Sequence, residues 1–193
     1  MASGNAGKLR EIARLLGDLD VEIVAQSDFG VTDAVESGTT FAENSLIKAQ
    51  HAARATGLAA IADDSGLAVD ALGGAPGVYS ARYSGAGATD DKNIDKLLLE
   101  LKTVSATSRG AAFHCVATFV MPHDSAPLVA EGEWRGSILE ARQGEGGFGY
   151  DPVFLDPQSG LSAAELSPDE KNARSHRGKA LQELVRLLDQ QFS

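Results

Sequence analysis

The chain has 193 residues, 43% apolar and 23% charged, which is enough for one globular domain with a sizeable core and excludes an intrinsically disordered protein. Its 17 basic and 27 acidic residues give a net charge of −10, so nucleic acids and anionic membranes are poor partners. The single cysteine, Cys115, excludes an internal disulfide and every multi-cysteine zinc site. No apolar run reaches membrane length and no signal peptide pattern opens the chain, so we expect a cytoplasmic protein.

The first third of the chain is predicted to alternate helices and strands. Apolar side chains recur at helical spacing over residues 8–16, and Gly17 follows them as a helix terminator. Thr40 and Glu43 have the spacing of a capping box, so a second helix is expected to begin at Phe41. The expected order is a helix over residues 8–16, a strand over 21–25, a helix over 41–56 and a buried strand over 58–62, with Asp63 directly after its end.

The rest of the chain is predicted to continue in the same way. Residues 89–101 place leucines and an isoleucine on one helical face. Two apolar segments, 111–121 and 128–134, are separated by a proline-bounded turn, which predicts two strands. Ser167, followed by proline, marks the start of a last amphipathic helix that runs to Leu188. These elements predict a mixed α/β protein, in which ligands usually bind where strands, loops and helices meet.

A loop of small residues, Ser3–Lys8, leads into the first predicted helix. Its glycines permit close approach, and backbone N–H groups at a helix start, together with Lys8, are groups that cradle a phosphate. The loop is not a Walker A motif, because Leu9 follows Lys8 where that motif has serine or threonine. The alternative is that the glycines serve only the turn.

Asp63 and Asp64 follow an apolar strand directly. Adjacent carboxylates there are costly unless they bind a metal, pair with cations or cap the next segment. Oxygen donors favour Mg²⁺ or Mn²⁺, and the two side chains would point to opposite faces of the strand. An Asx-type turn with two solvated acids explains the same residues. Lys48 shares the helical face of Phe41, so it either points inward as a phosphate ligand or extends to solvent, whereas Glu43 is explained by helix capping.

Two further segments suit a nucleobase. In residues 146–152 an aromatic ring flanked by glycines is followed by an acid, so the ring can stack on a base and the acid can accept from its N–H groups. Residues 171–177 gather four basic donor side chains, Lys171, Arg174, His176 and Arg177, in an otherwise acidic chain. Each segment has a simpler explanation, a hairpin connection for the first and a solvated helix face for the second. Together with the loop and the carboxylates, they form the set that binds a nucleotide with its polyphosphate on a metal ion.

Seven segments, in order along nearly the whole chain, carry one recognisable pattern. They are residues 3–8, 36–41, 43–48, 61–67, 73–82, 147–152 and 175–177. In this order they resemble the inosine/xanthosine triphosphate pyrophosphatase family, whose members act on non-standard purine nucleotides. The departure from the family pattern is at the start: only two residues precede Ser3, so the first strand is expected to be very short or to begin upstream of this sequence.

The resemblance implies one pyrophosphatase domain over residues 1–193, with an elongated two-lobed α/β fold, a mixed sheet, a nucleotide cleft between the lobes and a homodimer formed through one lobe. It implies Mg²⁺-dependent hydrolysis, with Mn²⁺ able to substitute, of ITP, dITP or XTP to the monophosphate and pyrophosphate. Asp64 would be the general base, Glu36 and Asp64 would bind the metal, and Asp63 would support the site. The implied substrate-binding residues are Ser3, Gly4, Asn5, Lys8, Lys48 and Ser65, and, around the purine, Phe148, Gly149, Tyr150, Asp151, Lys171, His176 and Arg177.

Selectivity would come from position 6 of the purine. Donors such as Lys171, His176 or Arg177 favour the carbonyl of hypoxanthine and xanthine and would be left unpaired by adenine. Replacing His176 or Arg177 by alanine is therefore expected to erode the preference for ITP over ATP more than it harms folding. The alternative enzyme is a septum-formation-inhibitor-type pyrophosphatase acting on dTTP or modified pyrimidine nucleotides, whose opening has a Pro-Arg-Arg run in place of Asn5 and Lys8. A binding module without turnover is disfavoured by the carboxylate pair.

Overall fold

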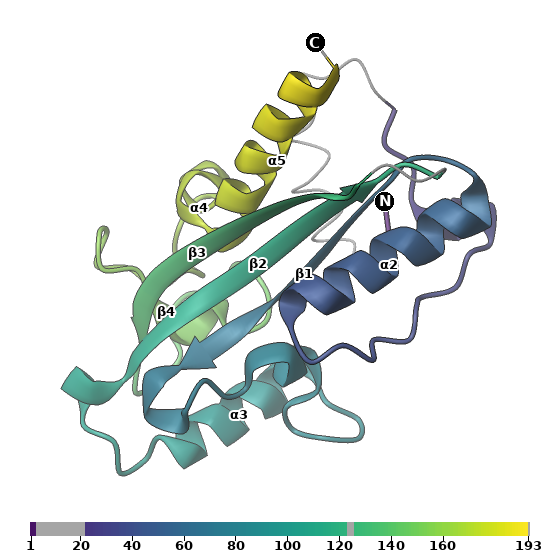
Figure 1. Cartoon of the computed structure of the whole chain (residues 1–193). Helices are drawn as coiled ribbons and strands as arrows, with labels where there is room; N and C mark the ends of the chain where they lie inside the picture. The colour runs from purple at the N-terminus through teal and green to yellow at the C-terminus, as the bar shows by residue number, and fades with distance from the viewer. Residues whose placement is uncertain (3–21, 123–125, 193) are drawn as a thin grey trace. The chain divides into compact units, whose positions relative to one another are not determined.

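The computed structural model describes residues 1–2, 22–122 and 126–192. Within these residues the strands form one sheet in the order β1-β2-β3-β4, and β4 pairs antiparallel with β3 (Figure 1). The helices and strands, in chain order, are α2 (Phe41–Thr56), β1 (Ala60–Val69), α3 (Asp90–Glu100), β2 (Gly110–Val120), β3 (Leu128–Ile138), β4 (Phe154–Leu155), α4 (Pro168–Arg174) and α5 (His176–Phe192). This combination confirms the predicted mixed α/β fold. None of the described helices is both long and apolar enough to span a membrane.

The chain divides into two compact units. Unit 1 comprises residues 1–64, 115–132 and 176–193, and unit 2 comprises residues 65–114 and 133–175. Each of the three long strands, β1 to β3, therefore contributes residues to both units.

In unit 1 the sheet is covered on both faces, by α2 on one and by α5 on the other (Figure 1). Ala60 and Ala62 of β1 pack in a cluster with alanines of α2, whereas Ile61 packs in a second cluster with leucines of α5. Because successive residues of a strand point to opposite faces, this alternation places the two helices on opposite sides. The small side chains of α2 allow its backbone to approach the strand closely. The single cysteine, Cys115, is buried in the α5 cluster, as expected of a packing residue.

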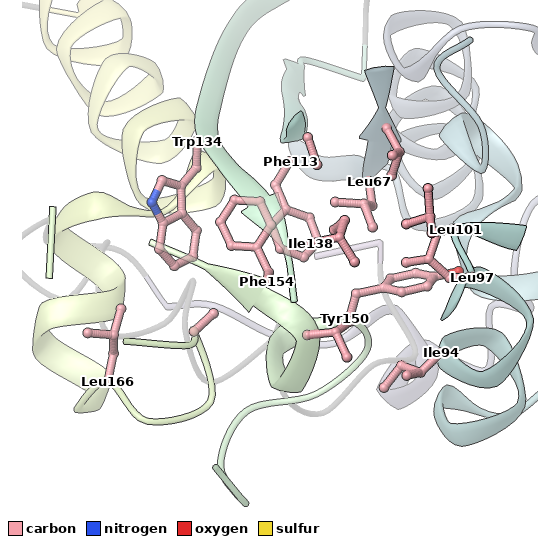
Figure 2. Packing of buried hydrophobic residues seen from close by; sticks show 14 residues of the cluster. Leu67, Ile94, Leu97, Leu101, Phe113, Trp134, Ile138, Tyr150, Phe154 and Leu166 are labelled. Carbon is pink, nitrogen blue, oxygen red and sulfur yellow. The ribbon is translucent and has the colours of Figure 1, made fainter. Parts of the chain in front are cut away.

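Unit 2 has its own core around three aromatic rings (Figure 2). The ring of Phe154 lies with its centroid 4.6 Å from that of Phe113 and 4.9 Å from that of Trp134. The aliphatic side of this core is lined by α3, which buries Ile94 and Leu97 completely or nearly so. Burial of each such side chain contributes roughly 1.5–3 kcal/mol. These contacts fix the strand ends and loops of unit 2.

Trp134, the only tryptophan of the chain, donates a hydrogen bond to Asp156, a buried carboxylate of this unit. Asp156 is 2% exposed and accepts hydrogen bonds from the Trp134 indole (3.0 Å), from the Ser159 amide (3.0 Å) and from Arg174 (3.0 Å). Burial alone would raise the pKa of Asp156, but the hydrogen bonds from Trp134, Ser159 and Arg174 outweigh it and hold the pKa below 3.8.

We expect Asp156→Asn to lower the free energy of unfolding at pH 7 by about 1–3 kcal/mol, because the amide cannot accept from Arg174 as the carboxylate does. A carboxyl group with a depressed folded-state pKa stabilises the fold above its unfolded pKa and loses this effect as the pH falls through the folded value. The difference between variant and parent should therefore narrow below pH 3.8. Urea unfolding followed by Trp134 fluorescence from pH 7 to pH 3 measures it, and a difference that stays constant with pH would contradict the assignment.

Several predicted elements are confirmed. Helix α2 opens with the predicted capping box between Thr40 and Glu43 and ends at Gly57, whose φ of 70° is favourable for glycine. Helix α3 begins after Thr89, which caps it through its side chain. Strands β2 and β3 are found where expected, although β3 runs on to Ile138 rather than ending at Trp134.

Three predictions of secondary structure are wrong. The strand expected to end before Asp63 continues to Val69, because cations neutralise the two acids and the residues beyond them are buried in unit 2. The single last helix is two helices, separated at Ser175, whose backbone is extended (φ −67°, ψ 155°). Residues 22–25 are not a strand, although Met1 exchanges backbone hydrogen bonds with Val24 and Gln26. The helix predicted over residues 8–16 and residue 21 lie outside the described residues.

Candidate active site

A lysine and two carboxylates meet within unit 1. The Lys48 ammonium lies 2.6 Å from Asp64 Oδ1 and 3.1 Å from Glu36 Oε1. The exposed fractions of the three side chains are 14% for Lys48, 11% for Asp64 and 29% for Glu36, so the group is largely withdrawn from solvent but still open on the Glu36 side. The inward orientation of Lys48 is thereby confirmed. We call Glu36, Asn44, Lys48 and Asp64 the Lys48 cluster.

Local structure explains how the cluster forms. Asn44 and Lys48 are one helical turn apart on α2, and Asp64 points to the α2 face of β1. The completely buried Asn44 side chain accepts from the Gly38 amide (2.8 Å) and donates to Asp64 Oδ2 (3.4 Å), so it links the segment that carries Glu36 to the strand.

Asn44 was not singled out as a site residue by the residue patterns. Its i, i+4 spacing to Lys48 is the signal that would have found it. Gly38 is required at its position, because a Cβ there would lie 2.7 Å from Asn44 Oδ1.

Electrostatics keep Lys48 charged. Burial lowers its pKa, but the Asp64 carboxylate, with smaller contributions from Asp63 and Glu36, outweighs burial, so the pKa lies above its ordinary value of 10.5. Carboxylate oxygens of Asp64 and Glu36 thus both lie close to the charged Lys48 ammonium.

The donor set also fits a small divalent cation. Mg²⁺ is typically held by one or two carboxylates together with substrate phosphates, and the cluster supplies two carboxylates, Glu36 and Asp64. Among the described residues no group of three histidine, cysteine or acidic side chains is arranged to hold a metal by itself. Among the described residues, this carboxylate pair would be the protein part of such a site, and substrate and water would supply further ligands.

Asp63 has a different environment, as its position on the opposite face of β1 predicts. Its side chain is completely buried, and its Oδ2 atom lies 3.4 Å from Nε of Arg177, whose side chain is 3% exposed. Arg177 follows His176 at the start of α5, and His176 is also buried. Gly132 of β3 permits this placement, because a Cβ there would overlap the His176 carbonyl oxygen.

A second cluster lies within unit 2. Asp151 Oδ2 accepts from the Phe148 amide (2.8 Å) and from the Lys171 ammonium (2.7 Å), and that ammonium is 4.6 Å from the centre of the Phe148 ring. Lys171 is 8% exposed and Asp151 is 3% exposed. The structure thus brings together an aromatic ring, an acid and a buried lysine from two segments that were singled out separately. We call residues 147–151 the Phe148 loop.

The other candidate residues are distributed as follows. Tyr150 is part of the unit 2 core, and its hydroxyl donates to the Ser80 carbonyl oxygen (2.8 Å). Glu43 caps α2, as expected, and accepts from the Thr39 and Thr40 amides. Ser65 is a half-buried residue of β1. The predicted phosphate loop lies outside the described residues, which include none of Ser3, Gly4, Asn5 and Lys8.

Solved structures with the same fold define the class of protein. A HAM1 protein from Coxiella burnetii superposes with a TM-score of 0.91 and 49% identity, over 98% of this chain and 96% of that one. The Ham1 protein of Staphylococcus aureus superposes with a TM-score of 0.88 and 40% identity, over 98% and 97% of the two chains. The fold is therefore that of the HAM1 proteins.

A sequence profile of the Ham1 family matches residues 1–187, and the chain belongs to this family. Two curated relatives, both named dITP/XTP pyrophosphatase, show how close the similarity is. The protein from Methylococcus capsulatus is 60% identical over 93% of this chain and 90% of its own length. The protein from Escherichia coli strain K12 is 56% identical over 97% of this chain and 96% of its own length. The family inferred from the seven sequence motifs is confirmed.

Proposed function

We propose that this protein hydrolyses non-standard purine nucleoside triphosphates, namely ITP, dITP and XTP, to the nucleoside monophosphate and pyrophosphate. The observation that carries the proposal is the Lys48 cluster, in which a buried, charged lysine is held between two carboxylates. The substrate class follows from the relatives, which are named dITP/XTP pyrophosphatases and match nearly the whole chain. Both names refer to purine nucleotides, so the septum-formation-inhibitor alternative is not favoured.

The cluster supplies the groups that this hydrolysis requires. Water attacks the α-phosphorus, the bond from that phosphorus to the bridging oxygen of the β-phosphate breaks, and pyrophosphate leaves. Asp64 would accept the proton of the attacking water, and Lys48 would offset the negative charge that develops on the leaving group. Mg²⁺, bound by Glu36 and Asp64, would supply further charge neutralisation when present. We propose that the Ser3–Lys8 loop and Ser65 complete the phosphate contacts.

The Phe148 loop and its neighbours suit the base. Phe148 offers a ring for stacking, while Lys171 offers a donor to the 6-carbonyl of hypoxanthine or xanthine, an atom that adenine replaces with an amino group. Asp151 holds both of these residues in place, because its Oδ2 atom accepts from the Phe148 amide and from the Lys171 ammonium. Gly149, Tyr150, His176 and Arg177 stay predicted members of the purine pocket. The cleft between two lobes, the homodimer and the cytoplasmic location likewise stay predictions.

Pyrophosphate release from equal concentrations of ITP, XTP, dTTP, ATP and GTP, with Mg²⁺ and with EDTA, tests the proposal. We expect release that requires the metal and favours ITP and XTP over ATP by at least about 10²-fold, because the 6-amino group of adenine leaves buried donors unpaired. Release that favours dTTP would move the protein to the septum-formation-inhibitor class. If none of the substrates releases pyrophosphate, the enzymatic proposal fails.

A further inference from the structure

The Phe148 loop is held by a carboxylate from a distant part of the sequence. Asp90 Oδ2 accepts a hydrogen bond of 2.7 Å from the amide of Gly149, the residue that follows the proposed base-stacking ring. Asp90 is the first residue of α3 and is separated from Gly149 by 59 positions along the chain, so no sequence motif contains both residues. Both residues belong to unit 2.

The loop needs such contacts because its backbone has little intrinsic preference for one conformation. Gly147 and Gly149 both have positive φ values, 74° and 61°, and glycine loses more conformational entropy than other residues when it is fixed. Three consecutive residues of the loop each make one such hydrogen bond. The Phe148 amide donates to Asp151, and the Gly149 amide donates to Asp90. The Tyr150 hydroxyl donates to the Ser80 carbonyl oxygen. Asp90 is the only one of these three partners that is solvent-exposed.

Helix capping does not account for Asp90. Thr89 caps α3 by accepting from the Lys92 amide (3.3 Å). Asp90 and its neighbour Asp91 are both acids of the first turn, so both interact favourably with the positive end of the helix dipole. They differ in their partners: Asp90 accepts from the Phe148 loop, whereas the Asp91 carboxylate lies 3.7 Å from Arg142. Charge-assisted hydrogen bonds to backbone amides are among the stronger ones, so the Asp90 contact is suited to fixing the loop.

We propose that Asp90 is a positioning residue for nucleobase recognition, acting through the Gly149 amide to hold the Phe148 ring in its stacking position. This inference rests on the proposed function. It predicts that loss of the Asp90 carboxylate weakens the binding of the base without affecting the binding of phosphates or the chemical step. Asp90→Ala should therefore raise KM for ITP about five-fold and leave kcat within about two-fold.

The experiment compares Asp90→Ala, Asp90→Asn and the matched control Asp91→Ala, which removes an acid from the same helix turn without touching the loop. Binding of inosine 5′-monophosphate and of inorganic tripolyphosphate is measured by calorimetry, beside KM and kcat for ITP and thermal unfolding. We expect Asp90→Ala to weaken inosine monophosphate binding about five-fold and to leave tripolyphosphate binding unchanged. Asp90→Asn, which keeps an acceptor for the Gly149 amide, should recover most of the loss, and Asp91→Ala should match the parent protein.

Two results would overturn the proposal. If Asp90→Ala binds inosine monophosphate as the parent does, the contact does not position the loop. If it weakens inosine monophosphate and tripolyphosphate equally, or if Asp91→Ala has the same effect, the contribution of Asp90 is general to the fold. Because binding is measured directly, this comparison is decisive even for a protein that fails to release pyrophosphate from ITP. That failure would overturn the proposed function separately.

Discussion

Asp64→Asn is expected to lower kcat for ITP by about 10²–10⁴-fold, the range that general-base catalysis contributes. The amide has nearly the same shape as the carboxylate, and its oxygen can still accept from Asn44, but its NH2 group then takes the place of the oxygen that accepts from Lys48. It has no charge, however, and cannot accept the proton of the attacking water. It also removes the nearer of the two carboxylates that face Lys48, at 2.6 Å. Steady-state pyrophosphate release measures the loss, and calorimetry with inosine monophosphate checks that base binding stays within about three-fold.

Glu43→Gln is the matched control for this change. It also converts an acid to its amide within unit 1, one residue before Asn44, but Glu43 caps α2 and is not part of the Lys48 cluster. Glutamine is accepted at this capping position, so we expect folding and turnover close to those of the parent. Full turnover by Asp64→Asn would refute Asp64 as the general base. Equal losses of kcat in Asp64→Asn and Glu43→Gln would show that the loss comes from removing one negative charge from unit 1 and not from the position of Asp64.

The sequence predicted those parts of the molecule that depend on short-range patterns. The capping box and terminal glycine of α2 involve residues within one or two turns of each other, and the opposite orientations of Asp63 and Asp64 follow from strand geometry. The sequence leaves two orientations possible for Lys48, inward or toward solvent. Helical spacing places a residue on one face of the helix but does not reveal which element packs against that face. Only the Asp64 contact, 16 positions away, decides it.

The parts that were missed depend on contacts between distant residues. An acidic pair followed by serine and glycine is typical of a strand end, yet β1 continues through it. Lys48 neutralises Asp64, and Arg177, 114 positions along the chain from Asp63, neutralises Asp63. The break at Ser175 interrupts an amphipathic pattern by a single residue, so periodicity does not show it. Ser175 directly precedes His176, the first residue of α5, and serine is a favoured N-cap residue. This serine is the sequence feature that indicates the start of a second helix.

The same long-range contact changes what is expected of Arg177. The sequence pattern alone predicts that Arg177→Ala affects selectivity more than folding. The structure instead pairs Arg177 with Asp63, whose side chain is completely buried, and removing one partner of a buried ion pair is costly because the other charge stays buried without that partner. We therefore expect Arg177→Ala to lower the free energy of unfolding by about 3–5 kcal/mol, a loss large enough to dominate any effect on selectivity.

Urea unfolding followed by circular dichroism measures this loss, with Arg186→Ala as the control. Arg186 lies on the same helix and pairs with Glu183 at the surface, where both side chains are well exposed, so its removal should leave stability nearly unchanged. The double variant Asp63→Asn, Arg177→Met removes both charges and keeps most of the volume, so it should recover much of the stability lost in Arg177→Ala. The effect of losing Arg177 on the preference for ITP over ATP can then be measured in a folded protein, with Asp63→Asn alone as the reference. If Arg177→Ala proves as stable as the Arg186→Ala control, the Asp63–Arg177 pair does not stabilise the fold, and the original expectation for Arg177 stands.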